Sequence, residues 1–177
     1  MVKKFQIFAI VVPLVLLLDQ LTKFLILQNF ALHDSIPILR GYFNLTYVQN
    51  PGAAFGMLSG SDPSFRGPFF VIVPAIALTV IAYLFIRLPP KSTWIPAALS
   101  CVVGGAVGNL IDRFRFGYVV DFIDFHWHYK AHFPAFNIAD LAISLGIGIL
   151  ILDMLFERDP EAYTQEKQEA PHASDPH

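Results

Sequence analysis

The 177-residue sequence is strongly apolar, since 55% of its side chains are hydrophobic and only 15% are charged. A soluble domain could not hide so many apolar residues when they are gathered into long runs, so the composition indicates a membrane protein. The formal net charge of −2 provides no basic field for nucleic acid, which is therefore not an expected partner. The single cysteine, Cys101, can form no internal disulfide and is interpreted as a small apolar residue.

Four apolar segments are long enough to cross a bilayer, because about 20 helical residues span its hydrocarbon core. They lie at about 5–27, 69–88, 94–111 and 136–156. The first follows Lys3 and Lys4, as the apolar part of a signal peptide would. No small-residue cleavage site comes after it, and apolarity resumes beyond Lys23, so we interpret it as a retained helix.

Four spans place both termini on one side of the membrane and two loops, about 28–68 and 112–135, on the other. Equal numbers of Lys and Arg lie on the two sides, but two dense basic clusters favour a cytoplasmic location for the termini. These clusters are Lys3 with Lys4 and Arg87 with Lys91. We therefore expect a membrane domain over residues 1–156 and a polar, disordered cytoplasmic tail over 157–177.

Both loops contain segments typical of β-strands. The stretch 42–48 has strand composition, and residues 118–127 alternate with a period of two, which places Asp121 on the same face as three apolar side chains. The two loops could form a small sheet that lies on the membrane. Residues 59–67, with one proline and two glycines, are interpreted as a flexible connection.

Ionisable and amide side chains near the spans are informative, because each costs several kcal/mol in a bilayer unless it is paired. With the loop order above, they all lie toward one membrane face. They are Asp19, Lys23, Asn50, Asn109, Asp112, Arg113, Asp121, Asn137 and Asp140.

Most of these residues also have a purely structural explanation. Asp19 and Lys23, four residues apart, could form a helical ion pair. Asn137 and Asp140 have the spacing of an N-cap and an N3 acid, and the charged pair that ends the third span could anchor it at the interface. Asp121 is harder to explain, because a carboxylate on an apolar strand face needs a partner or a proton.

Three histidines in the second loop raise the question of a metal. His126, His128 and His132 have no carboxylate near them in a familiar ligand motif, so we interpret them as interfacial residues and expect no metal. Asp124, beside His126 on the other strand face, is expected to be solvated.

Small residues recur at a spacing of four on the last two spans. Gly104 with Gly108, and Ser144 with Gly148, predict close packing of helices. The polar residues that this packing would bring together are Asn109, Asp112 and Asp140.

Two carboxylates held close together cannot both ionise cheaply, so they share a proton. One can then activate a water molecule while the other donates a proton to a carbonyl oxygen. This aspartic-protease chemistry suits Asp121 and Asp140. Motifs of zinc and serine hydrolases are absent from the sequence. A proton or ion carrier would also place aspartates in a bundle, although no inverted repeat supports it.

Five stretches closely resemble the motifs of lipoprotein signal peptidases (signal peptidase II), in the order of that family. They are DQLTK at 19–23, NPGAAF at 50–55, GGAVGNLIDR at 104–113, VVDF at 119–122 and FNIAD at 136–140. The resemblance runs from the first span to the fourth and leaves out the tail after residue 156.

The resemblance implies an aspartic endopeptidase that removes the signal peptide from a prolipoprotein, just before a cysteine carrying diacylglycerol. Asp121 and Asp140 match the family's catalytic pair. Supporting roles are implied for Asp19, Lys23, Asn50, Gly52, Asn109, Asp112, Arg113 and Asn137. The family's fold is a bundle of four transmembrane helices with a small periplasmic β-sheet cradle.

The same resemblance implies an active site on the periplasmic face of the bacterial inner membrane and cytoplasmic termini. It also implies contact with membrane lipid, inhibition by globomycin-type compounds, and no cofactor.

Overall fold

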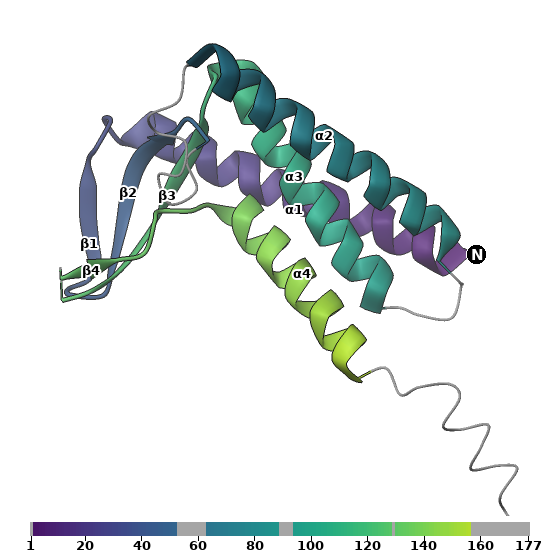
Figure 1. Cartoon of the computed structure of the whole chain (residues 1–177). Coiled ribbons are helices and arrows are strands. Elements are labelled where there is room, and N and C mark those ends of the chain that lie inside the picture. The colour runs from purple at the N-terminus through teal and green to yellow at the C-terminus, as the bar shows by residue number, and fades with distance from the viewer. Residues whose placement is uncertain (1, 53–62, 89–93, 129, 157–177) are drawn as a thin grey trace, which may run out of the picture.

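The computed structural model describes residues 2–52, 63–88, 94–128 and 130–156. It contains four long helices and four strands, arranged as a helical bundle with a sheet at one end (Figure 1). In chain order the elements are α1 (Val2–Asn29), β1 (Ser35–Leu39), β2 (Phe43–Asn50), α2 (Pro63–Arg87), α3 (Trp94–Phe116), β3 (Val119–Trp127), β4 (Ala131–His132) and α4 (Ile138–Phe156). The expected tail at 157–177 lies outside the described residues, and the division between domain and tail stays a prediction.

All four helices are long and apolar enough to cross a membrane, which confirms the expected fold class. Two boundaries differ from the prediction. Helix α2 begins at Pro63, so the interpretation of 59–67 as a flexible connection is wrong from Pro63 onward. Proline suits the first helical turn because its φ angle is helical and it needs no N–H partner there. Helix α3 continues to Phe116 rather than ending near residue 111.

Glycines allow the close packing of α3, which contacts the other three helices. A Cβ atom at Gly104 would lie 2.9 Å from the Cβ of Val15 on α1, and one at Gly108 would lie 2.6 Å from Oδ2 of Asp19, also on α1. On α4, Gly148 was predicted to pack closely against a neighbouring helix, and this prediction is wrong. Gly148 has nothing within 4 Å of a built Cβ, whereas Gly146 packs on Ala98 and Val102 of α3.

The strands form an antiparallel sheet in the order β1-β2-β3-β4. Strands β2 and β3 correspond to the two predicted strand segments and pair with Val48 opposite Asp121. The short strands β1 and β4 were not predicted. A core of Ile26, Tyr47, Val120 and Phe122 joins the sheet to the end of α1, and this junction holds the polar side chains singled out from the sequence.

Candidate active site

Asp121 lies in the middle of the described polar network at the junction of sheet and bundle. It belongs to β3 and is almost fully buried, with 1% of its surface exposed. Its two carboxylate oxygens accept hydrogen bonds from the side-chain amides of Asn50 (2.9 Å) and Asn137 (2.7 Å). The expected burial of this carboxylate is therefore observed, but its immediate partners are amides rather than apolar groups.

Asp140 lies in the first turn of α4 and forms a reciprocal cap with Asn137. The backbone N–H of Asp140 donates to Asn137 Oδ1 (2.9 Å), and the backbone N–H of Asn137 donates to Asp140 Oδ2 (3.3 Å). This is the capping arrangement predicted from the spacing. The other carboxylate oxygen accepts from Asn109 Nδ2 at 2.7 Å, so capping leaves room for a second role.

Asn137 connects the two carboxylates directly. Its side-chain amide donates to Asp121, while its backbone N–H donates to Asp140. The residue has no exposed surface, and its amide also donates to Asn109 Oδ1 at 3.2 Å. Because one buried residue touches both acids, the distance and orientation between them are set by the fold.

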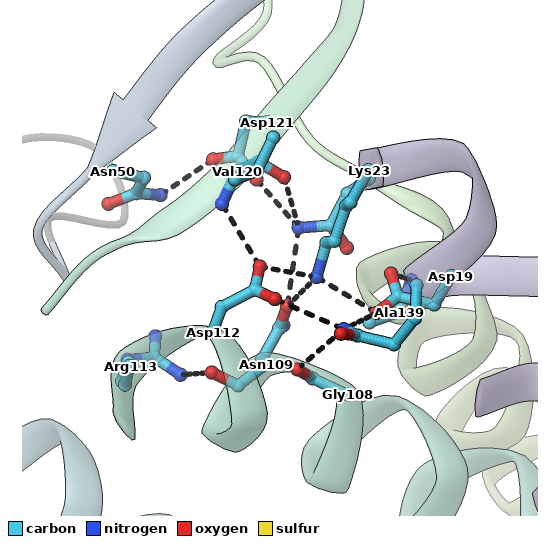
Figure 2. A network of polar contacts seen from close by, with 12 residues as sticks. Asp19, Lys23, Asn50, Gly108, Asn109, Asp112, Arg113, Val120, Asp121 and Ala139 are labelled. Atoms are coloured by element: carbon cyan, nitrogen blue, oxygen red, sulfur yellow. Dashed lines mark hydrogen bonds and ion pairs between the residues drawn. The ribbon is translucent and has the colours of Figure 1, made fainter. Parts of the chain in front are cut away.

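Lys23 occupies a second layer of the network, behind the amides (Figure 2). Its ammonium forms ion pairs of 2.9 Å with both Asp19 and Asp112. It also donates to Asn109 Oδ1 at 3.0 Å. Because this oxygen faces the ammonium, the NH₂ group of Asn109 is turned toward Asp140. The predicted helical pair of Asp19 and Lys23 is present, and it also orients a group that contacts a carboxylate.

Asp19 fixes the start of α4 from across the bundle. Its Oδ1 accepts the backbone N–H of Ala139 (2.9 Å), one of the first-turn donors that have no helical partner. The neighbouring Gln20 donates to Asp19 (3.1 Å) and to Asp112 Oδ1 (3.0 Å). Gln20 was not among the candidate site residues; a polar amide within an apolar helix, three residues before Lys23, was the signal for it.

Asp112 differs from its predicted placement. Close packing of α3 and α4 was expected to bring it together with Asn109 and Asp140, and the 2.7 Å bond between those two confirms part of that expectation. Asp112 instead contacts Lys23 and accepts the backbone N–H of Val120 at 3.1 Å. It therefore ties α3 to β3, the strand that carries Asp121.

The pKa of Asp121 is raised from the ordinary value of 3.8 to about 7. Burial is the main cause, because it penalises the charged form, and the negative charge of Asp140 adds to it. The amides of Asn50 and Asn137 act in the opposite direction, since they donate to the carboxylate. At a pH near this value, Asp121 therefore carries a proton about half of the time.

A cavity of about 500 Å³ opens beside Asp140. Its walls include Asn50, Gly52, Phe70, Arg113, Phe136 and Leu141. Asn50 Oδ1 accepts the backbone N–H of Gly52 at 2.9 Å, where φ is +111°, a conformation that glycine adopts without strain. The guanidinium group of Arg113 lies 5.7 Å from the centre of the Phe70 ring and donates to the backbone oxygen of Asn109. A cationic donor and an apolar wall thus face the same space as the carboxylate.

The three histidines lie away from this network. His126 is buried, and His128 packs edge-on against Tyr42 at the tip of the sheet, with 4.9 Å between ring centres. The backbone of His132 pairs with that of His126. Within the described ranges, no group of three or more His, Cys, Asp or Glu residues could hold a metal ion.

Asp124 is less solvated than predicted. Its side chain is 14% exposed, and it accepts a hydrogen bond from Asn44 Nδ2 at 3.1 Å on β2. Asn44, which lies opposite Asp124 in the strand pair, thus contacts the carboxylate that was expected to meet water.

All the candidate site residues therefore lie at the junction. They contact Asp121 or Asp140, form the layer behind these contacts, or line the cavity. Four membrane-spanning helices with carboxylates and amides buried beneath a small sheet define a multi-pass membrane protein equipped for acid–base chemistry. The family model described as "Signal peptidase (SPase) II" matches residues 11–156. The chain belongs to this family and is a protease of the aspartic class.

Relatives and solved structures agree with that assignment. The chain is 48% identical over 155 residues to the lipoprotein signal peptidase of Syntrophus aciditrophicus (strain SB), covering 88% of this chain and 96% of the relative. It is 46% identical over 158 residues to the lipoprotein signal peptidase of Geobacter sulfurreducens (strain ATCC 51573 / DSM 12127 / PCA), covering 89% and 97%. A solved bacterial membrane enzyme, 35% identical, superimposes with a TM-score of 0.73 over 85% of this chain and 94% of its own.

Proposed function

We propose that this protein removes signal peptides from diacylglyceryl-modified prolipoproteins, cleaving before the lipid-modified cysteine, with Asp121 and Asp140 as the catalytic dyad. The observation that carries the proposal is the bridge by Asn137, whose side chain binds one acid and whose backbone binds the other. Membership in the signal peptidase II family supports the substrate class. It also favours proteolysis over the ion carrier that the sequence left open.

The environments of the two acids support different roles for them. Asp121 is buried, and its pKa of about 7 lets it carry a proton at neutral pH. Asp140 borders the cavity and accepts hydrogen bonds from Asn109 and from the backbone of Asn137. A carboxylate on the cavity wall can contact a water molecule there, whereas Asp121 has only 1% of its surface exposed. Asp121 is therefore the general acid of the first step, and Asp140 is the general base.

In the first step, Asp140 takes a proton from a water molecule as the water oxygen bonds to the scissile carbonyl carbon. Asp121 gives its proton to the carbonyl oxygen, which yields a neutral tetrahedral diol. In the second step, Asp140 protonates the leaving nitrogen, the C–N bond breaks, and Asp121 recovers its proton as the new carboxyl group forms. The mechanism uses no cofactor.

The remaining network residues have supporting roles in this proposal. Asn50 and Asn137 bind Asp121, and Asn109 orients Asp140. Arg113 and Gly52 line the cavity that would receive the peptide. Three residues lie behind them. Lys23 positions Asn109, Asp19 positions the start of α4, and Asp112 positions β3.

We further propose that the enzyme lies in the bacterial inner membrane, with its dyad on the periplasmic face and both termini in the cytoplasm. The basic Lys3, Lys4 and Arg87 lie at helix ends remote from the dyad, which supports this orientation under the positive-inside rule. A substrate with an acylated cysteine partitions into lipid and would arrive laterally, so membrane lipid is a working partner. Globomycin-type inhibitors are expected to compete for the cavity.

The test is cleavage of a diacylglyceryl-modified prolipoprotein by purified wild type, Asp121→Asn and Asp140→Asn, with the folding of each variant verified in detergent. Both folded variants should lose cleavage, and EDTA should leave the wild type active. Appreciable turnover by either variant would refute the dyad.

A further inference from the structure

Two turns of the sheet form an exposed apolar tip. One connects β1 to β2 and the other connects β3 to β4. They lie side by side, because the backbone N–H groups of His126 and His128 donate to the carbonyl oxygens of Tyr42 (2.9 Å) and Gly41 (2.6 Å). The exposed side chains here are Leu39, Tyr42, Phe125, Trp127 and Phe133, which we call the aromatic tip. They line a shallow hollow of about 480 Å³.

The aromatic tip is held in one arrangement although it is exposed. The ring of Tyr42 contacts those of Trp127 and His128 edge-on, with 5.3 and 4.9 Å between ring centres. The rings of Trp127 and His128 are 5.1 Å apart. Trp127 is nevertheless 63% exposed. A preorganised aromatic cluster of this kind can bind a partner without first losing side-chain freedom.

The position of the tip relative to the spans places it over lipid. The strands run across the direction of the helices, and the tip projects sideways beyond the start of α4 (Figure 1). On α4, Leu141 and Leu145 are more than half exposed, as expected of residues that face lipid. Phe133 lines both the hollow at the tip and the cavity beside Asp140. The apolar surface therefore continues from the flank of α4 onto the tip.

The residue types at the tip fit the boundary between lipid and water. Tyrosine and tryptophan concentrate there because each ring has an apolar body and a polar group. Arg40 and Lys130, one on each turn, are both exposed, and neither turn contains an acidic residue. Positive charges beside an apolar patch are complementary to anionic lipid headgroups.

We propose that the aromatic tip inserts into the headgroup region of the bilayer on the dyad side and anchors the sheet there. The sheet then rests on lipid beside α4, so the cavity at Asp140 opens toward the membrane. The choice of a lipid surface over a protein partner rests on the sideways reach of the tip, its continuity with α4 and its two basic residues. The orientation of the chain in the cell does not enter this inference.

Trp127 itself can report the contact. The sequence contains two tryptophans, and Trp94 lies at the far end of α3 from the sheet, so Trp94→Phe leaves Trp127 as the single fluorophore. This variant would be placed in nanodiscs of phosphatidylcholine with phosphatidylglycerol. Lipids brominated near the glycerol would test shallow insertion, and aqueous acrylamide would test exposure to water.

Insertion predicts that the brominated lipids quench Trp127, that acrylamide quenches it weakly, and that its emission lies to the blue of its value when the same protein carries Leu39→Asp. Strong quenching by acrylamide without quenching by brominated lipid would overturn the proposal, because the tip would then lie in water. Weak quenching by both would also overturn it, since protein, such as a second copy, would cover the tip. No substrate is used, so the result is independent of the proposed protease activity.

Discussion

Two buried lysines hold opposite ends of the helical bundle in different ways. Lys23, at the sheet end, pairs with two carboxylates and one amide oxygen. Lys4, at the other end, donates to two backbone carbonyls of α2, those of Phe85 (3.0 Å) and Ile86 (2.9 Å), and to that of Leu88 (2.8 Å), just after the helix. A cation at the C-terminus of a helix satisfies carbonyls that have no helical partner and complements the helix dipole.

Lys4 joins two helices, whereas Lys23 also positions a side chain that contacts Asp140. The hydrogen bonds of Lys4 end at backbone oxygens, and its ammonium also lies over the rings of Phe5 (5.5 Å) and Phe85 (5.8 Å), so it joins α1 to the end of α2. The contacts of Lys23 continue through Asn109 to Asp140, a carboxylate of the proposed dyad. A lysine at one end of the bundle is therefore linked to helix ends, whereas a lysine at the other end is linked to the proposed dyad through Asn109.

The largest effect is expected from Lys23→Met. Removing the ammonium leaves Asp19 and Asp112 buried without their cation, and breaking a buried ion pair from one side costs about 3–5 kcal/mol. Thermal unfolding in detergent should show a large fall in the midpoint. Cleavage should be lost even at temperatures where the variant is still folded, because Asn109 is no longer oriented. A folded Lys23→Met enzyme with wild-type kcat would show that the second layer does not position Asp140.

Asn137→Ala should have the second-largest effect. It removes the amide that binds Asp121 and the N-cap of α4, whose loss costs about 1 kcal/mol. Misplacing the dyad should lower kcat about 100-fold, far more than the stability change explains. Steady-state kinetics with a lipidated substrate would measure this, and Asn44→Ala, at the sheet but outside the dyad, is the matched control. An equal loss in both variants would contradict a specific role for Asn137.

Lys4→Met is the matched counterpart of Lys23→Met at the opposite end of the bundle. It removes three hydrogen bonds to backbone carbonyls at and just after the end of α2, so a loss of about 1–3 kcal/mol of stability is expected. The folded variant should retain the kcat of the wild type, because no contact of Lys4 leads to the dyad. A large fall in kcat at a temperature where the variant is folded would contradict the different roles of the two lysines.

The pH profile gives a smaller and more specific effect. If Asp121 is the general acid, as we propose, activity should fall as pH rises through its pKa of about 7. Asn50 donates to the ionised form and so lowers this pKa, and Asn50→Ala should move the fall in activity to higher pH. The kcat/KM of both proteins, measured across the neutral range, tests this. A shift to lower pH would reverse the assigned role of the amide.

Stability should depend on the same group with a definite sign. The pKa of Asp121 is raised in the folded protein, so between about 4 and 7 the folded state binds a proton that the unfolded state has released. Its contribution therefore makes the protein less stable as pH rises through this window. Thermal unfolding midpoints of wild type and Asp121→Asn should converge at the acidic end and separate toward neutral pH.

Much of this molecule could be predicted from its sequence. The four spans follow from apolar length, β3 follows from its alternation, and Asp121 stood out because a carboxylate on an apolar strand needs an explanation. The Asn137–Asp140 cap could also be predicted, since its partners are three residues apart. These features depend on neighbours along the chain.

The features that were missed depend on partners distant in the chain. Whether Gly146 or Gly148 packs on α3 is decided by the rotation of α4, which its composition does not specify. Asp112 meets Lys23 rather than Asp140 because α1 contacts α3 at that level. Lys4 resembled a simple topology signal, and its carbonyl partners lie more than 80 residues away. Such contacts require the assembled bundle.

The buried network is expected to hold a proton on Asp121 up to near neutral pH. Infrared spectroscopy of the protonated carboxyl stretch, recorded across pH for wild type and Asp121→Asn, measures this directly. We expect a carboxylic acid band that disappears with a midpoint of about 7 and is absent from the Asp121→Asn protein. A band that persists in that variant, or one that titrates only in the ordinary acidic range of an aspartate, would contradict it.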